Sequence, residues 1–463
     1  MCTVSESTAK PRWSSEFARS SDKWMRSLGV QRATAIGASW SLIIRAAGMV
    51  VSFAVQTLLA RKLGQNGYGR YVYVLAWMNV AMVVAKLEFD TLALRFIASY
   101  AGTHRWALLY GFIKKTQRLT FMFSASTALL AAVAIVIARP YLHPRLALAG
   151  LWACVLLVPT AILALQGGFL QGFQRMVSAQ APQQLLRPVA FGVFLVGLYW
   201  RFGAAFLAWH AVLANLLATV LSLAVSTRYL NRSIPMRALV LKPEYEVALW
   251  MRTARGLMAI ALAQIVIGAQ SDVVIVGSIL GTHMAALYST ASQVATLVSF
   301  AAAAITAIAI PQLAGLYARR DMHSLQRLLR LMLLSATGLT LPVLAIVIIW
   351  GHQLLGVFGE AFVAGYRVMF ILSFTQAAAA IVGVAGGYLL TMTGHERDAA
   401  KIIVVSSILN LVLSLVLTPW LGMSGTAFAT CTATVVRSAW LYWFAKRELK
   451  LNLLQVYVSQ RPV

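Results

Sequence analysis

The sequence is poor in acidic residues and in charge of any kind. Of its 463 residues only 13 are Asp or Glu, and charged residues of both signs make up 11% of the chain. Soluble domains carry about 25% charged residues, so the composition excludes an ordinary soluble protein. Apolar residues amount to 60%, with a mean hydropathy of +0.77. They form continuous runs and do not alternate with polar residues, which predicts an all-α polytopic membrane protein and not a transmembrane β-barrel.

Cysteine and clustered histidine are also scarce. The three cysteines, Cys2, Cys154 and Cys431, lie far apart in the sequence and lack the spacing of metal ligands. The histidines are scattered without any His-x-x-x-His pair, so we expect no metal site. We expect no cofactor either, unless H⁺ or Na⁺ serves as a coupling ion. The segments between the apolar runs are too short for a catalytic domain, which favours a transporter over an enzyme.

The apolar runs number about twelve, and most have the ~20 residues that a helix needs to cross a bilayer. They cover residues 36–59, 70–90, 119–138, 146–169, 187–200 with its flanks, 206–227, 256–280, 288–311, 331–350, 367–393, 402–420 and 424–445. Lys and Arg total 39 and give a net charge of +26. With the N-terminus in the cytoplasm, most of these residues fall in cytoplasmic segments, so the positive-inside rule places both termini there. The basic charge then reflects orientation and attraction to anionic lipids, and we expect no nucleic-acid partner.

The two halves of the chain share landmarks. A polar segment with several glycines, residues 59–71, separates the first two apolar runs and predicts a tight helical hairpin. The same offset of 217 residues separates Gly64 from Gly281, Tyr71 from Tyr288, and Tyr100 from Tyr317. We therefore predict two pseudo-symmetric six-helix bundles arranged as parallel repeats. The predicted parts are a basic cytoplasmic tail (1–35), the first bundle (36–230), a cytoplasmic linker (231–255), the second bundle (256–445) and a cytoplasmic C-terminal tail (446–463).

Polar residues form a stripe on the first predicted span. They recur at steps of four, three, four and four residues, which defines one helix face, and comprise Ser41, Arg45, Gly48, Ser52 and Gln56. An ionisable group costs about 2.5–3.5 kcal/mol in the bilayer, so Arg45 should face protein or water. Its guanidinium suits phosphate oxygens, which makes the stripe a candidate wall of a substrate cavity. The alternative is that the small residues Gly48 and Ser52 form a helix-packing seam.

Further polar residues lie on the seventh and second predicted spans. Gln264 and Asp272 share a face of the seventh span, and both are cavity candidates. Asp272 is either a proton or sodium site or the partner of a basic residue such as Arg45. On the second span the candidates for a gate or for ion coupling are Asn79, Lys86, Glu88 and Asp90. The alternative is that Lys86 and Asp90 neutralise each other as i,i+4 neighbours.

Several motifs occur in a fixed order along residues 36–445. They are Leu58 to Gly64 with Tyr68 to Tyr71, Asp272 to Gly277 with Leu280 and Gly281, Pro311 to Ala314, Asn410 to Leu413, and Pro419 to Gly422. In this order they resemble the motifs of polysaccharide transporters of the O-antigen flippase (Wzx) type, within the multidrug/oligosaccharidyl-lipid/polysaccharide (MOP) exporter superfamily. The resemblance implies two six-helix bundles that form a V around a central cavity, as in the MATE transporters.

The same resemblance implies a function. It predicts a flippase that translocates an undecaprenyl-pyrophosphate-linked oligosaccharide across a bacterial inner membrane by alternating access. Its implied partners are this lipid-linked substrate, membrane lipids, and glycan polymerase and chain-length proteins. Two alternatives stay open. One is an ion-coupled multidrug exporter of the same fold, whose cavity should be more acidic, and the other is a membrane glycan polymerase or ligase.

Overall fold

The computed structural model describes residues 30–266, 269–318, 322–383 and 396–449, and the regular secondary structure within these ranges is entirely helical. The helices of the first half are α2 (Val30–Lys86), α3 (Phe89–Gly102), α4 (Trp106–Ala138), α5 (Pro144–Gly172), α6 (Met176–Gln180), α7 (Arg187–Phe202) and α8 (Ala208–Asn231). A short helix, α9 (Met236–Val240), precedes the second half. The second half contains α10 (Val247–Val266), α11 (Ala269–Ile279), α12 (Thr282–Ala318), α13 (Met322–Ile349), α14 (Gly351–Gly356), α15 (Tyr366–Ala378), α17 (Glu396–Leu421) and α18 (Met423–Leu449). The π-helix η2 (Ala181–Leu186) joins α6 to α7, and the 3₁₀ helix η4 (Glu360–Gly365) follows α14.

The lengths of these helices identify a multi-pass membrane protein. Among the described residues, eight helical segments are long and apolar enough to span a membrane, and the first, Ile43–Gly102, extends over 60 residues. At 1.5 Å per residue such a segment greatly exceeds the ~30 Å hydrocarbon core, so it cannot be a single straight crossing. The predicted membrane class is therefore confirmed, whereas the number of about twelve spans stays a prediction.

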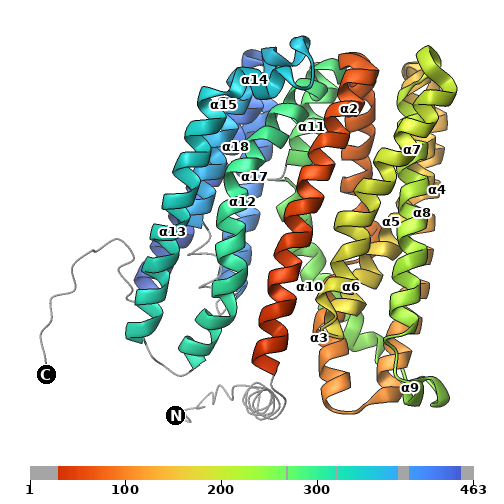
Figure 1. The fold of residues 1–463 in the computed structure, drawn as a ribbon, viewed down its shortest axis with the longest axis vertical. Helices are drawn as coiled ribbons and strands as arrows, with labels where there is room; N and C mark the ends of the chain where they lie inside the picture. The colour runs from red at the N-terminus through yellow and green to blue at the C-terminus, as the bar shows by residue number, and fades with distance from the viewer. Residues whose placement is uncertain (1–29, 267–268, 319–321, 384–395, 450–463) are drawn as a thin grey trace, which may run out of the picture.

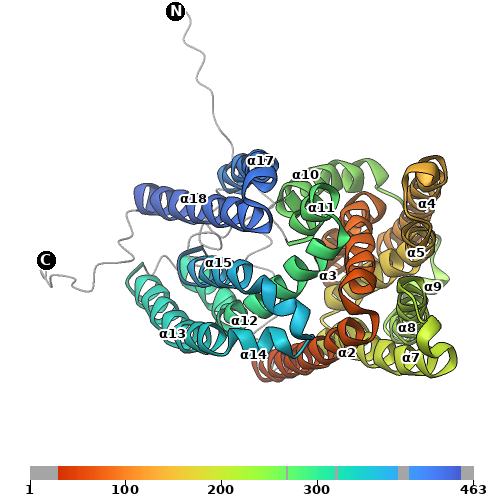
Figure 2. The same cartoon turned by 90° about the horizontal axis from the view of Figure 1, so that it is seen from above.

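The helices form two groups with α2 and α11 between them. Figure 2 shows α4, α5, α7 and α8 on one side of the molecule and α13, α15, α17 and α18 on the other. The groups meet where α2 packs against α11 and α12. Because α2 belongs to the first half and the other two helices to the second, this contact joins the two halves of the chain.

Glycine makes the sharp turn in each half. Gly64 bends α2 with φ +64° and ψ −179°, and Gly281, between α11 and α12, has φ +95°. Residues other than glycine have a strained backbone in these conformations. Figure 1 shows α2 rising to this bend and descending again. Gly64 and Gly281, which are 217 residues apart in the sequence, therefore both lie at a turn with positive φ. Below, the bend end is the end of the bundle at Gly64, and the tail end is the end at α9.

The two halves are tied together at the bend end. Arg61 Nε donates to the carbonyl oxygen of Val357 at 2.5 Å, and Gln293 Nε2 donates to the Tyr68 hydroxyl at 2.9 Å. The rings of Tyr68 and Phe362 meet edge to face, with centroids 6.0 Å apart. Each contact pairs a residue near the α2 bend with one from the second half, so the structure is closed at this end.

Close backbone contact at this closure requires Gly69. A Cβ atom at Gly69 would overlap the carbonyl oxygen of Thr282 at the start of α12. We expect Gly69→Ala to force the halves apart and to lower the free energy of unfolding by about 1–3 kcal/mol, the usual cost of overpacking. The apparent Tm of detergent-purified protein measures this effect. Gly197→Ala is the matched control, since a Cβ there meets no atom within 4 Å. Equal Tm values for the two variants would contradict the prediction.

Candidate functional site

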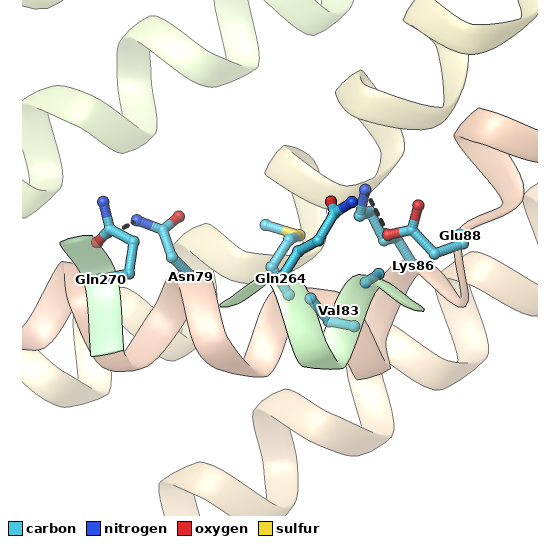
Figure 3. A pocket seen from close by; sticks show the side chains of 8 residues that line it. Asn79, Val83, Lys86, Glu88, Gln264 and Gln270 are labelled. Carbon is cyan, nitrogen blue, oxygen red and sulfur yellow. Dashed lines mark hydrogen bonds and ion pairs between the residues drawn. The ribbon is translucent and has the colours of Figure 1, made fainter. Parts of the chain in front are cut away.

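A polar pocket of about 370 Å³ lies between the two halves. Figure 3 shows this interface pocket, which α2 lines on one side and α10 and α11 line on the other. Its lining residues are Asn79, Met82, Val83, Lys86, Glu88, Ala261, Gln264 and Gln270. It therefore brings together Gln264 from the predicted cavity set with Asn79, Lys86 and Glu88 from the predicted gate set.

Lys86, which lines this pocket, is held by two carboxylates. Its Nζ lies 2.9 Å from Glu88 Oε1 and 2.8 Å from Asp90 Oδ2, and all three side chains are mostly buried. The predicted i,i+4 pair between Lys86 and Asp90 is therefore present, and Glu88 is a second partner. The helix breaks between Lys86 and Phe89, where Leu87 and Glu88 have φ of +50° and +54°. This break turns Glu88 back toward Lys86 (Figure 3).

Hydrogen bonds cross the interface beside the pocket. Asn79 Nδ2 donates to Gln270 Oε1 at 3.2 Å, and the hydroxyls of Tyr73 and Ser278 lie 2.9 Å apart. Asn79 and Tyr73 belong to α2, whereas Gln270 and Ser278 belong to α11. Replacing these hydrogen bonds by bonds to water costs little free energy compared with separating an apolar core. This interface is therefore suited to opening and closing.

A second polar pocket, of about 310 Å³, lies within the first half. We call it the Arg187 pocket, and its lining residues are Ser52, Val55, Gln56, Tyr71, Leu75, Met78, Asn79, Gln183, Arg187, Pro188, Phe191 and Asn215. None of them is acidic. Nε and Nη2 of Arg187 donate to Asn215 Oδ1 at 3.3 and 3.1 Å, and Asn215 Nδ2 donates to the Tyr71 hydroxyl at 3.3 Å. The guanidinium of Arg187 therefore lines a cavity, and the side chain that it donates to, Asn215, is neutral.

The predicted stripe on the first span leads into this pocket. Ser41 Oγ and Arg45 Nε both donate to Gln180 Oε1, at 2.6 and 3.3 Å. A Cβ at Gly48 would overlap the backbone of Gln184, so Gly48 serves helix packing. Further along, Ser52 and Gln56 line the Arg187 pocket. The stripe is thus a packing seam over one part of its length and a cavity wall over another.

Arg45 itself is exposed and is not among the residues that line the Arg187 pocket. It does not pair with Asp272 in this structure. Arg45 binds Gln180 of the first half, whereas Asp272 accepts hydrogen bonds from Tyr288 and Thr430 of the second half.

Sequence reasoning missed Arg187, because it placed this residue at the cytoplasmic edge of a span that begins there. In the structure α6, η2 and α7 form one helical segment, Met176–Ala205. Arg187 therefore lies about 16 Å along this segment from its start. The signal in the sequence was the glutamines directly before the apolar run, namely Gln180, Gln183 and Gln184.

Asp272 forms a separate buried cluster in the second half. Its side chain is 1% exposed, and its Oδ2 accepts hydrogen bonds from Tyr288 at 2.7 Å and from Thr430 at 2.8 Å. The Thr430 hydroxyl also lies 3.3 Å from Asn410 Oδ1. Asp272 Oδ1 is buried and accepts no hydrogen bond from the described residues.

The donors around Asp272 fit a proton or a small hard cation. Carboxylate, hydroxyl and amide oxygens are the ligands that such cations prefer, and a buried carboxylate in a membrane protein is typical of ion pathways. Within the described ranges no group of three or more His, Cys, Asp or Glu residues could hold a metal ion. The oxygen set therefore favours H⁺ or Na⁺ over a transition metal.

The sequence matches the model of a family described as "Polysaccharide biosynthesis protein" over residues 35–317, which is more than half of the chain. The chain belongs to this family. The sequence is similar to that of the probable low-salt glycan biosynthesis flippase Agl15 of Haloferax volcanii, with 23% identity over 168 residues. This match covers 36% of the chain and 35% of the relative, so the chain aligns with about a third of that protein's length.

Solved structures show which fold this polysaccharide biosynthesis family member adopts. An inward-facing multidrug resistance MATE transporter of the MOP superfamily gives a TM-score of 0.68 at 14% identity, over 88% of this chain and 98% of that one. A MOP superfamily transporter from Pyrococcus furiosus, described as having a binding pocket of reverse polarity, gives 0.63 at 14% identity over 89% and 95%. The outward-facing form of a MATE transporter gives 0.59 at 14% identity over 89% and 95%. The predicted MATE-like fold is therefore confirmed.

The ion pairs of Lys86 with Glu88 and Asp90 lead to a prediction about stability. Lys86→Met leaves Glu88 and Asp90 as two unpaired, mostly buried carboxylates. We expect it to lower the free energy of unfolding by about 1–3 kcal/mol, which lies between the effects of exposed and fully buried pairs. Adding Glu88→Gln and Asp90→Asn to Lys86→Met should restore most of the loss, as measured by apparent Tm.

The control is Lys401→Met, since the Lys401–Asp398 pair is exposed and spans 3.2 Å. That variant should leave the apparent Tm unchanged. Two observations would contradict the prediction: equal shifts for the two lysine variants, or a further drop when the carboxylates are neutralised.

Proposed function

We propose that this protein translocates an oligosaccharide linked to undecaprenyl pyrophosphate across a bacterial inner membrane by alternating access. Membership of the polysaccharide biosynthesis family, the MATE-like fold and the name of the Haloferax relative as a glycan flippase support the proposal. In it, the tail end and both termini face the cytoplasm, as the distribution of basic residues predicts. Glycan polymerase and chain-length proteins would act on the product after translocation.

The observation that carries the proposal is a polar route along one face of α2. The interface pocket and the Arg187 pocket share Asn79. Their α2 residues recur at helical spacing from Tyr71 through Leu75 and Asn79 to Lys86. A glycan headgroup needs hydroxyl, amide and charged partners inside the bilayer, and this face supplies them. In the proposed cycle the headgroup enters from the tail end, opposite the closure at the bend end.

Arg187 supplies the charge that a pyrophosphate requires. A guanidinium donates several hydrogen bonds at once to phosphate oxygens, and Nη1 of Arg187 has no protein acceptor among the described residues. The pocket contains no carboxylate, which disfavours the cationic drugs of the alternative reading. Arg45 lies on the same stripe as Ser52, two helical turns or about 10 Å nearer the tail end. It is a second candidate for contact with the pyrophosphate.

Substitution of Arg187 tests this proposal. We expect Arg187→Gln to lower the rate of flipping of a lipid-linked oligosaccharide about 10- to 100-fold, which corresponds to the loss of one charge-assisted contact. Proteoliposomes that contain the fluorescent lipid-linked substrate measure this rate. Arg201→Gln is the control, because Arg201 lies on the same helix but is exposed near the bend end. Arg45→Ala, assayed in parallel, tests the second arginine. An unchanged rate in a folded Arg187→Gln protein would remove Arg187 from the site.

We also propose that Asp272 couples translocation to an ion gradient. Asp272→Asn keeps the side chain's size but removes the charge that a proton or Na⁺ would neutralise. We expect this variant to lose the stimulation of flipping by a proton or sodium gradient and to retain gradient-independent exchange. Asp398→Asn, at an exposed carboxylate, should retain full stimulation. Undiminished gradient-driven transport by Asp272→Asn would show that another group carries the coupling.

A further inference from the structure

The segment between α8 and α10 carries a surface that the translocation pockets do not use. α8 ends at Asn231, and α9 covers Met236–Val240. Figure 1 shows α9 at the tail end of the molecule, just past the end of α8. In Figure 2 it lies at the periphery beside α8. None of its residues lines the interface pocket or the Arg187 pocket.

The position of α9 is fixed by packing. Ala238 is fully buried and belongs to the apolar cluster that contains Leu230 and Trp250. After α9, the backbone N–H of Glu244 donates to the carbonyl oxygen of Ala107 at 3.2 Å. The segment is thus attached to the first half at several points. The outward direction of its other side chains is therefore a property of the fold.

The outward side of this segment is apolar. Met236 is 79% exposed and Val240 is 86% exposed, and Leu239 and Leu241 are 46% and 45% exposed. Four large apolar side chains within six residues would be unfavourable in water. On the spanning helices such exposure faces lipid chains. α9 lies past the end of a spanning helix, where the headgroup region of the bilayer begins.

Basic residues surround these apolar side chains. The exposed ones are Arg228, Arg232, Arg237 and Lys242. The acidic residue nearest to them in sequence is the exposed Glu244, so the net charge of the segment from Arg228 to Glu244 is strongly positive. An apolar side with a basic rim is the pattern of an interfacial helix that binds an anionic bilayer surface.

We propose that residues 228–242 form a docking site for anionic membrane lipids. The apolar side chains of α9 enter the boundary between headgroups and acyl chains, and the basic residues bind lipid phosphates. Because α8 spans the membrane up to Asn231, α9 is already at the depth that this contact requires. The site anchors the connection between the two halves to the bilayer while the halves move. It is independent of the translocated substrate.

The depth of α9 in the bilayer tests the apolar contact. Val240→Cys, in a chain whose Cys2, Cys154 and Cys431 are replaced by Ser, carries a fluorescent label in nanodiscs of phosphatidylcholine and phosphatidylglycerol. We expect brominated acyl chains to quench the label and aqueous iodide to be excluded from it. Quenching by iodide with no effect of brominated lipid would overturn the proposal. Protection from both quenchers would point to protein contacts and would also overturn it.

A second measurement tests whether the basic residues contribute to the binding of anionic lipid. We expect replacement of Arg232, Arg237 and Lys242 by Gln to weaken binding of phosphatidylglycerol to the purified full-length protein by about fivefold per residue. Native mass spectrometry with phosphatidylglycerol and phosphatidylcholine measures this preference. The control replaces Arg139, Arg145 and Arg201, which are exposed near the bend end, and should leave binding at α9 unchanged. Equal losses for both triple variants would contradict a site at α9. Neither readout depends on transport, so failure here would leave the proposed function untouched.

Discussion

The organisation of this protein depends on the cost of placing charge inside a bilayer. A charged side chain there needs partners, water or a ligand, and the two pockets meet this need in different ways. Lys86 has two carboxylates within 2.9 Å, so its charge is fully compensated by the protein. Arg187 has only the amide of Asn215. The compensated group lines the pocket between the halves. The uncompensated group lines a cavity, where in our proposal it meets the anionic pyrophosphate.

The two halves use one scaffold for opposite charges. Tyr71 and Tyr288 are 217 residues apart, both are fully buried, and each hydroxyl contacts a polar cluster of its own half. In the first half the cluster is cationic, because Tyr71 accepts a hydrogen bond from the asparagine that holds Arg187. In the second half it is anionic, because Tyr288 donates to Asp272. Each half thus places a polar cluster at this tyrosine, a cationic one in the first half and an anionic one in the second.

Features that depend on local sequence could be predicted, and those that depend on distant contacts could not. The glycine turn followed from the offset between Gly64 and Gly281, and the Lys86–Asp90 pair followed from i,i+4 spacing. The role of Arg187 required knowing that the π-helix η2 joins α6 to α7 as one segment. The partner of Asp272 on α18 is 158 residues away in sequence. No spacing rule links these positions, because packing of the second bundle brings them together.

The position of α11 explains how an ion site and a headgroup route can be coupled in the proposed cycle. This helix carries Asp272 on its buried side and Gln270, two residues earlier, in the interface pocket. Gln270 accepts the hydrogen bond from Asn79, the residue shared by both pockets. In the proposed cycle, neutralising Asp272 would remove the free-energy cost of a buried charge, and we propose that this changes how α11 packs against α12 and α18. Any resulting shift of α11 reaches Asn79 directly through one hydrogen bond. In this proposal, binding at either site would bias the same interface, which is the requirement for coupled transport.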